Sequence, residues 1–60
     1  MLKVEMKDLK QHVRNLISRT KENSYQDSGT HRCEKSDGRI YVAAVDKNGR
    51  AMEFFEIIQK

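Results

Sequence analysis

The fold is indicated most clearly by residues 37–58, which read DGRIYVAAVDKNGRAMEFFEII. Asp37-Gly38 and Asn48-Gly49 are typical of tight hairpin turns, because both pairs tolerate the positive φ angles that such turns need. The run between them, residues 40–45, is continuously apolar and rich in strand-forming residues. Such a run predicts a central strand whose two faces are both covered.

The neighbouring segments extend this strand into a sheet. In residues 51–58, apolar and polar side chains alternate less regularly, but the segment is rich in strand-forming residues. It therefore predicts a strand that follows the second turn. Residues 30–35 are polar and predict an edge strand whose charges discourage pairing with other chains. We therefore expect a three-stranded antiparallel β-meander over residues 30–58.

A single amphipathic helix is predicted over residues 8–22. Asp8 is placed to accept hydrogen bonds from the first free backbone amides, and Gln11 stands where a capping-box partner belongs. The side chains that repeat at helical spacing are Leu9, Val13, Leu16, Ile17 and Thr20.

Two segments have less regular patterns. Residues 1–7 either begin in an extended strand, with Leu2, Val4 and Met6 on one face, or extend the helix back to about residue 3. Residues 23–29 are small and polar and predict a loop. Tyr25 is the one large side chain there, and we expect it to fold back over the core.

Together these segments predict one small α+β domain over residues 1–60. Its helix packs on the three-stranded meander in the order αβββ, or βαβββ if the N-terminus forms a strand. A chain of 60 residues buries only about 60% of its unfolded surface, so the stability margin is expected to be thin or shared with a partner.

Composition excludes several classes of protein. The chain has no apolar run long enough for a membrane-spanning helix and no apolar segment after Met1 of the kind found in secretion signals. Its one cysteine, Cys33, cannot form an intramolecular disulfide, which favours a reducing cytoplasm. His31 and Cys33 share one face of a strand, but a structural zinc site needs a second ligand pair that the sequence lacks. We expect neither a metal, a cofactor nor an enzymatic activity.

The strongest functional indication comes from the second face of the sheet, because one helix cannot cover both. The apolar side chains expected to remain bare there are Tyr41, Val45, Phe55 and Ile57. Patches of this kind mark interfaces, so a homodimer or a protein partner is predicted. The alternative is that sheet twist, Tyr25 and the N-terminal residues hide the patch.

The net charge of +3 lies entirely in residues 1–22. On a helical wheel, one stripe beside the apolar face contains Lys7, Lys10, Arg14 and Lys21. The first three of these are expected to steer the protein toward an acidic partner surface. The alternatives are that all four contact nucleic-acid phosphates or that they only solvate the helix.

The predicted layout resembles the first four elements of the double-stranded-RNA-binding domain. Gly29-Thr30-His31 lies near the position of that family's Gly-Pro-x-His loop but lacks the proline, and the family's second, lysine-rich helix has no counterpart. No RNA-binding residue is assigned from this resemblance. In general style the chain is similar to compact accessory proteins of bacteriophages and mobile elements. We therefore expect a small regulator or inhibitor that occupies a surface of a protein partner, with a nucleic-acid-binding module as the alternative.

Overall fold

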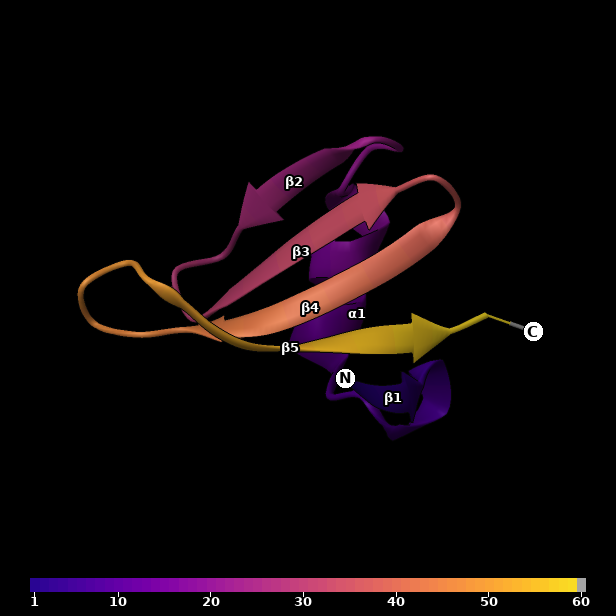
Figure 1. Ribbon diagram of the computed structural model, residues 1–60, viewed down its shortest axis with the longest axis horizontal. Coiled ribbons are helices and arrows are strands. Elements are labelled where there is room, and N and C mark those ends of the chain that lie inside the picture. Colours follow the sequence, from indigo (N-terminus) through magenta and orange to yellow (C-terminus); the bar gives the residue numbers. More distant parts are fainter. Residues whose placement is uncertain (60) are drawn as a thin grey trace.

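The computed structural model describes residues 1–59 as an α+β domain with one α-helix and a five-stranded mixed sheet (Figure 1). Its elements in chain order are β1 (Leu2–Glu5), the short 3-10 helix η1 (Met6–Asp8), α1 (Gln11–Arg19), β2 (Ser24–Asp27), β3 (His31–Ser36), β4 (Arg39–Val45) and β5 (Ala51–Ile58).

The strands lie in the order β1-β5-β4-β3-β2. Strands β2 to β5 form a continuous antiparallel meander, whereas β1 pairs with β5 in parallel. The first strand therefore lies beside the last one, and the two edges of the sheet are β1 and β2. This arrangement closes the chain on itself through backbone hydrogen bonds between residues far apart in sequence.

The predicted meander is confirmed in β3, β4 and β5. The predicted number of strands, which was three or, with an N-terminal strand, four, was wrong. Residues 2–5 form a strand, which settles the N-terminal alternatives in favour of the extended start. Residues 24–27 were predicted to be loop and instead form β2, with Tyr25 opposite Glu34 and Asp27 opposite Arg32. Pairing with β3 overrides the weak strand propensity of these polar residues.

The helix is shorter than the predicted range of 8–22. Leu9 adopts an extended backbone between η1 and α1, and Lys10 is the N-cap without a side-chain hydrogen bond. The predicted capping box is therefore absent: Asp8 lies in η1, and Gln11 donates instead to Asn15 Oδ1 at 2.9 Å. Among the described residues, no helix combines the length and apolar character that a membrane crossing requires.

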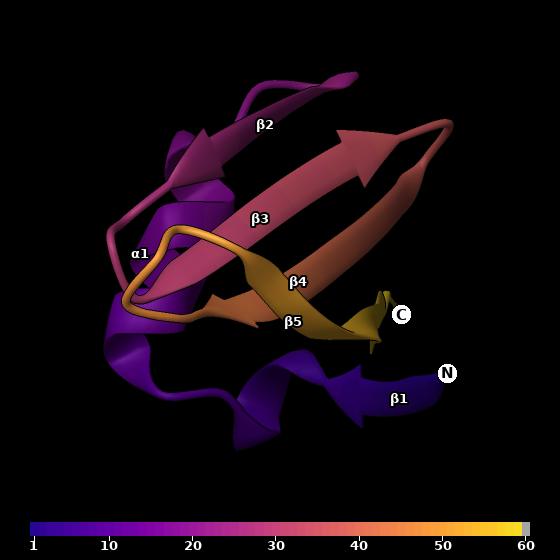
Figure 2. The ribbon, with the colours of Figure 1, turned by 60° about the vertical axis from the view of Figure 1, so that its left-hand side comes forward.

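Helix α1 runs across one face of the sheet, from the β1 edge toward the β2 edge (Figures 1 and 2). Five strands span about 19 Å from first to last. The nine residues of α1 supply about 14 Å of this distance, and the extended residues at its two ends supply the rest. One short helix thus serves as the connection between the two edges and, among residues 1–59, as the only second layer.

The core lies between α1 and the sheet. Leu16 of the helix, Cys33 of β3 and Val42 of β4 are its largest completely buried side chains. Val4 and Met6 pack against this cluster at its edge. The remaining buried members are Leu9, Val13, Ile17, Ile40 and Ile57.

The two predicted turns have different outcomes. Asp37 and Gly38 have φ angles of 52° and 77°, as a two-residue hairpin turn requires, so this prediction is confirmed. The second connection is longer than Asn48-Gly49. Asp46 Oδ1 accepts hydrogen bonds from the backbone amides of Asn48 and Arg50, both at 2.9 Å, and only Gly49 takes positive φ.

Replacement of Leu16 by alanine tests whether one helix side chain holds the two layers together. We expect Leu16→Ala to lower the free energy of unfolding by about 2–5 kcal/mol, because it leaves a cavity in a small core. The exposed neighbour Asn15→Ala serves as the matched control and changes it by less than about 0.5 kcal/mol. Chemical denaturation of both variants provides the comparison, and equal stability of the two contradicts this description of the core.

Candidate functional site

The face of the sheet turned away from α1 carries no second layer of backbone (Figures 1 and 2). We call its side chains the open face. The apolar ones in β4 are Tyr41, Ala43 and Val45, whereas Ile40 and Val42 point into the core. The prediction that β4 presents apolar residues to both faces is therefore confirmed. The full set is Lys3, Glu5, Tyr25, Asp27, Arg32, Glu34, Ser36, Arg39, Tyr41, Ala43, Val45, Ala51, Phe54, Glu56 and Ile58.

Phe55 and Ile57 do not belong to the open face, so their predicted grouping with Tyr41 and Val45 was wrong. Phe55 pairs with Val42, and Ile57 is only 2% exposed in the core. Period-two alternation divides each strand into two faces correctly, but it does not say which face of one strand matches which face of the next. The β4–β5 register decides this and places Phe54 and Ile58 on the open face instead.

The open face is partly covered by its own side chains. Ala43 is completely buried there although no helix lies over it. Its cross-strand neighbours are Arg32 and Phe54, which are themselves half-buried. Tyr25 does not fold over the core as predicted; it lies on the β2 edge and is 64% exposed. The apolar band is thus narrower than predicted.

Tyr25 contacts a charged residue, Arg32, which is in turn bound by a second one, Asp27. The Arg32 guanidinium lies 5.3 Å from the centre of the Tyr25 ring. Arg32 in turn donates to both carboxylate oxygens of Asp27, at 2.7 and 3.2 Å. This hydrogen-bonded pair lowers the pKa of Asp27 and raises that of Arg32. The result is an aromatic side chain supported by a fixed cation at one edge of the open face.

Tyr41 occupies the middle of the open face. It lies opposite Glu34 of β3 and Glu56 of β5. A hydrogen bond with Tyr41 raises the pKa of the Arg39 guanidinium. The central tyrosine is therefore surrounded by charges of both signs.

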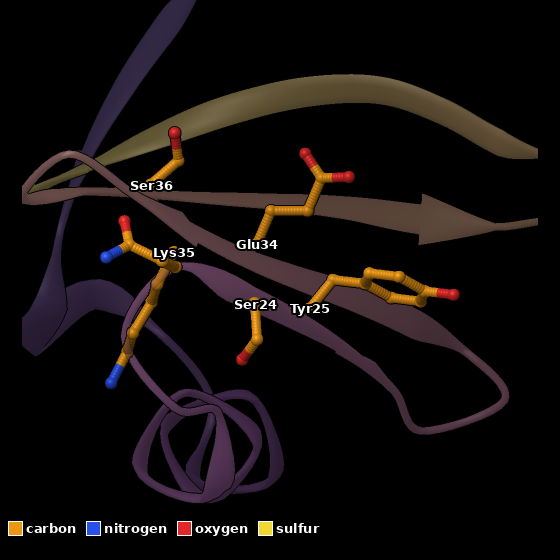
Figure 3. A pocket seen from close by; sticks show the side chains of 6 residues that line it. Ser24, Tyr25, Glu34, Lys35 and Ser36 are labelled. Carbon is orange, nitrogen blue, oxygen red and sulfur yellow. The ribbon is translucent and has the colours of Figure 1, made fainter.

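A shallow pocket of about 240 Å³ opens at the end of the sheet where β2 begins and β3 ends (Figure 3). Tyr25 and Glu34 project on one side of the strands, and Lys35 extends toward the helix side. Its other lining residues are Asn23, Ser24 and Ser36. The pocket offers hydrogen-bonding groups but lacks a histidine or cysteine beside its single carboxylate.

The predicted basic stripe is not a single row, because only Arg14 lies within α1. Its guanidinium donates to the backbone oxygens of Leu9 at 2.9 Å and Lys7 at 3.4 Å, so it stabilises the connection from η1 to α1. Lys7 forms an ion pair with Glu5 at 3.3 Å. Lys10 and Lys21 lie beyond opposite ends of the helix.

Charge is nevertheless divided between the two sides of the molecule. Residues 9–21, which we call the helix layer, contain four basic side chains and no acidic one. These are Lys10, Arg14, Arg19 and Lys21. Four of the nine acidic residues of the chain, Glu5, Asp27, Glu34 and Glu56, lie on the open face. The positive side of the protein is therefore the helix side.

A histidine pair was not predicted from the sequence. The rings of His12 in α1 and His31 in β3 have centroids 5.1 Å apart, tilted by 53°. Partial burial, followed by the nearby His12 and Lys10, lowers the pKa of His31. Because the two histidines are far apart in the chain, only the docking of α1 on β3 brings them together.

Cys33 is fully buried, and burial raises the pKa of its thiol. A buried thiol with a raised pKa is a poor nucleophile. Within residues 1–59, no three histidine, cysteine, aspartate or glutamate side chains gather closely enough to hold a metal ion.

Comparison with known proteins gives no match: no family model fits the chain, and no curated protein or solved structure is significantly similar to it. The functional argument therefore depends on the surfaces described above.

The lowered pKa of His31 makes stability depend on pH. A base with a lowered pKa in the folded state binds its proton more readily when the chain is unfolded. The free energy of unfolding should therefore fall as pH drops from the ordinary value of 6.5 toward the folded pKa of His31. His31→Gln should flatten this slope.

NMR titration of the imidazole ring protons measures the same effect directly. His12→Gln removes the electrostatic contribution of the neighbouring imidazole and should move the His31 pKa upward, toward its ordinary value. A His31 resonance that titrates at or above the ordinary value in the unaltered protein contradicts the arrangement.

Proposed function

We propose that the protein is a small, non-enzymatic regulator or inhibitor that binds a protein partner through its open face. Small accessory proteins of bacteriophages and mobile elements are the type to which we assign it. The observation that carries the proposal is that β4 is apolar on both faces, while α1 covers only one. We also propose a cytoplasmic location, with which the unpaired, buried Cys33 is compatible.

An ordinary solvated sheet face does not explain this pattern. Antiparallel sheets with one wet face show apolar and polar residues in alternation along each strand. In β4, Tyr41, Ala43 and Val45 break this alternation, and Phe54 and Ile58 of β5 extend the apolar band sideways. A partner that covers this band would supply the missing second layer.

The size of the open face is adequate for such a contact. A standard protein interface buries about 800 Å² on each partner. The whole molecule exposes 4418 Å², so this interface needs somewhat less than one-fifth of its surface. One face of a two-layer domain provides that area.

The side chains of the open face are of types that contribute strongly to binding. Tyrosine and arginine are enriched among the residues that dominate binding energy. Tyr25 contacts Arg32, and Arg32 is hydrogen-bonded to Asp27, so part of the side-chain ordering that binding requires is already present. Tyr41 provides a second aromatic contact at the centre.

The charge of the open face bears on the partner's chemistry. Its basic residues are Lys3, Arg32 and Arg39, against four acidic ones. Lys7, Lys10 and Arg14 were expected to steer the protein to an acidic partner, but Lys10 and Arg14 belong to the helix layer, and Lys7 lies in η1, where it pairs with Glu5 at the border of the open face. The partner we propose presents an apolar centre with peripheral charges of both signs.

Site-specific photo-crosslinking in source cells tests this proposal and captures the partner in the same step. A photoreactive amino acid at positions 25, 34 and 56 of the open face should crosslink to the same protein. The matched positions 11, 15 and 18 on the helix layer should not. Crosslinks that arise only from the helix-layer positions contradict the proposal.

The captured protein then allows a quantitative measurement. Tyr41→Ala should weaken its binding by about tenfold or more, as expected of a central contact residue. Asn15→Ala should leave binding unchanged. Circular dichroism establishes that both variants remain folded, and equal affinities for the partner contradict the assignment of the open face.

A nucleic-acid-binding function is the second candidate, and one observation favours it. The helix layer presents four basic side chains without an acidic neighbour from residue 9 to residue 21. Its other exposed side chains include Gln11, Asn15 and Ser18, which are able to hydrogen-bond to phosphates or base edges. The proposal would then place nucleic acid on the side opposite the open face.

Binding of duplex DNA and RNA at a series of salt concentrations tests the second candidate. Phosphate contacts give a log–log slope of about −0.9 for each cation engaged. Lys10→Glu with Lys21→Glu should make the slope shallower by about 2 on this scale. Arg14 is left intact in this variant because it holds the η1–α1 connection. Absence of binding even at low salt eliminates the candidate.

A further inference from the structure

The most exposed large aliphatic side chains gather at one corner of the sheet. Met1, Leu2 and Met52 are 77%, 66% and 58% exposed. Leu2 and Met52 line a groove of about 310 Å³ together with Ala44, Glu53, Phe54 and Phe55. Helix α1 packs against β2 and β3, and Figure 2 shows the N-terminal end of β1 on the side away from it. This corner is therefore left uncovered by the chain itself.

The same corner borders a free strand edge. Strand β1 is an edge strand of the sheet, so half of its backbone amide and carbonyl groups point away from β5. Its four residues alternate apolar and charged: Leu2 and Val4 face the helix side, and Lys3 and Glu5 belong to the open face. An exposed apolar corner next to an unpaired edge is a surface suited to strand addition.

We propose that this edge binds a second copy of the chain, with the two β1 strands antiparallel about a two-fold axis at Val4. In this register each Lys3 lies directly opposite Glu5 of the second copy, on the open face. Each Leu2 lies opposite Met6 of the second copy, on the helix side. Opposite charges and apolar side chains thus meet their complements in both copies at once.

Charge selects this register over its nearest rival. A shift of the axis from Val4 to Lys3 would place the two Lys3 side chains opposite each other, which is unfavourable. It would also move Leu2 away from Met6. Since η1 begins at Met6, the strand pairing in the proposed register covers Lys3, Val4 and Glu5, and the contact of Leu2 with Met6 lies just beyond it.

A pocket also lies at the C-terminal end of β1. It has a volume of about 260 Å³ and is lined by Glu5, Met6, Lys7 and Ile58. The exposed Leu2 at one end of β1 and Met6 just beyond its other end form a self-complementary apolar pair, as a two-fold interface requires. Glu5 already binds Lys7, and a carboxylate offers about four acceptor sites, so the contact with Lys3 of the second copy would add to the interactions that Glu5 makes within its own chain.

The opposite edge offers no equivalent complementarity. In β2, Tyr25 and Asp27 already contact Arg32 of their own chain. A two-fold axis at Gln26 would place these two occupied side chains opposite each other, and no exposed aliphatic residue of the described chain lies nearby. The β1 edge is therefore the one we assign to the dimer.

This dimer does not depend on the proposed partner surface. A two-fold axis perpendicular to the sheet keeps both helices on one side and both open faces on the other. The product is a ten-stranded sheet in which the two open faces lie next to each other.

Charge reversal at the two paired positions tests the proposal by analytical ultracentrifugation. The unaltered protein should be a dimer at micromolar concentration. Lys3→Glu places two acidic pairs in the interface, and Glu5→Lys places two basic pairs there. Each variant alone should raise the dimer dissociation constant by about tenfold or more.

An equimolar mixture of the two variants provides the decisive test of the pairing between Lys3 and Glu5. One copy then carries two glutamates and the other two lysines at positions 3 and 5, so the mixed pair regains both attractions. We expect the mixture to form a heterodimer although each variant alone is monomeric. Lys10→Glu, outside the interface, serves as the charge-reversal control and should remain a dimer.

Circular dichroism of each variant establishes that the fold is retained. Leu2→Asp supplies a second route, since it removes the apolar contact without changing the residues of the ion pair, and it should also yield a monomer. An unaltered protein that stays monomeric to millimolar concentration overturns the proposal. Variants that dimerise as well as the original, or a mixture that does not associate, overturn it equally.

Discussion

The structure depends on the fact that, in the described part of the chain, one nine-residue helix is the only layer that covers a five-stranded sheet. Leu16, Val42 and Cys33 lose all contact with solvent between these layers, and they form the centre of the only core that the described chain builds. Since a domain of this size buries a modest share of its surface, this one contact must provide most of the stability. The parallel pairing of β1 with β5 then joins the first strand of the sequence to the last one.

From this single-sided coverage three different surfaces follow. The helix layer carries the excess positive charge, because its inward stripe is apolar and its outward residues include no acid. The open face keeps an apolar band in β4 that its own neighbours cover only in part, Ala43 most completely. The corner at Leu2 and Met52 lies beyond the reach of α1 and meets a free strand edge. A partner at the centre of the open face and a second copy at the β1 edge would share only Lys3 and Glu5, which lie at the border between the two surfaces, so both contacts are compatible in one assembly.

The sequence predicted most of this architecture where the local signal was strong. The apolar run 40–45, the Asp37-Gly38 turn and the strand at 51–58 were predicted correctly, because turn chemistry and strand propensity act over a few residues. Strand β2 was missed because its residues, Ser24 to Asp27, form a strand only through pairing with β3. The face of Phe55 and Ile57, the histidine pair and the role of Arg14 were missed for a related reason: each depends on register or docking between distant segments.

Solvent accessibility of methyl groups in the free protein tests most directly whether one face of the sheet is uncovered. A soluble paramagnetic agent added during NMR broadens signals in proportion to their exposure. Val45 and Ile58 on the open face should broaden strongly, whereas Val42 and Ile57, on the same two strands but facing α1, should be protected. Equal protection of all four methyl-bearing residues in the monomer would contradict single-sided coverage.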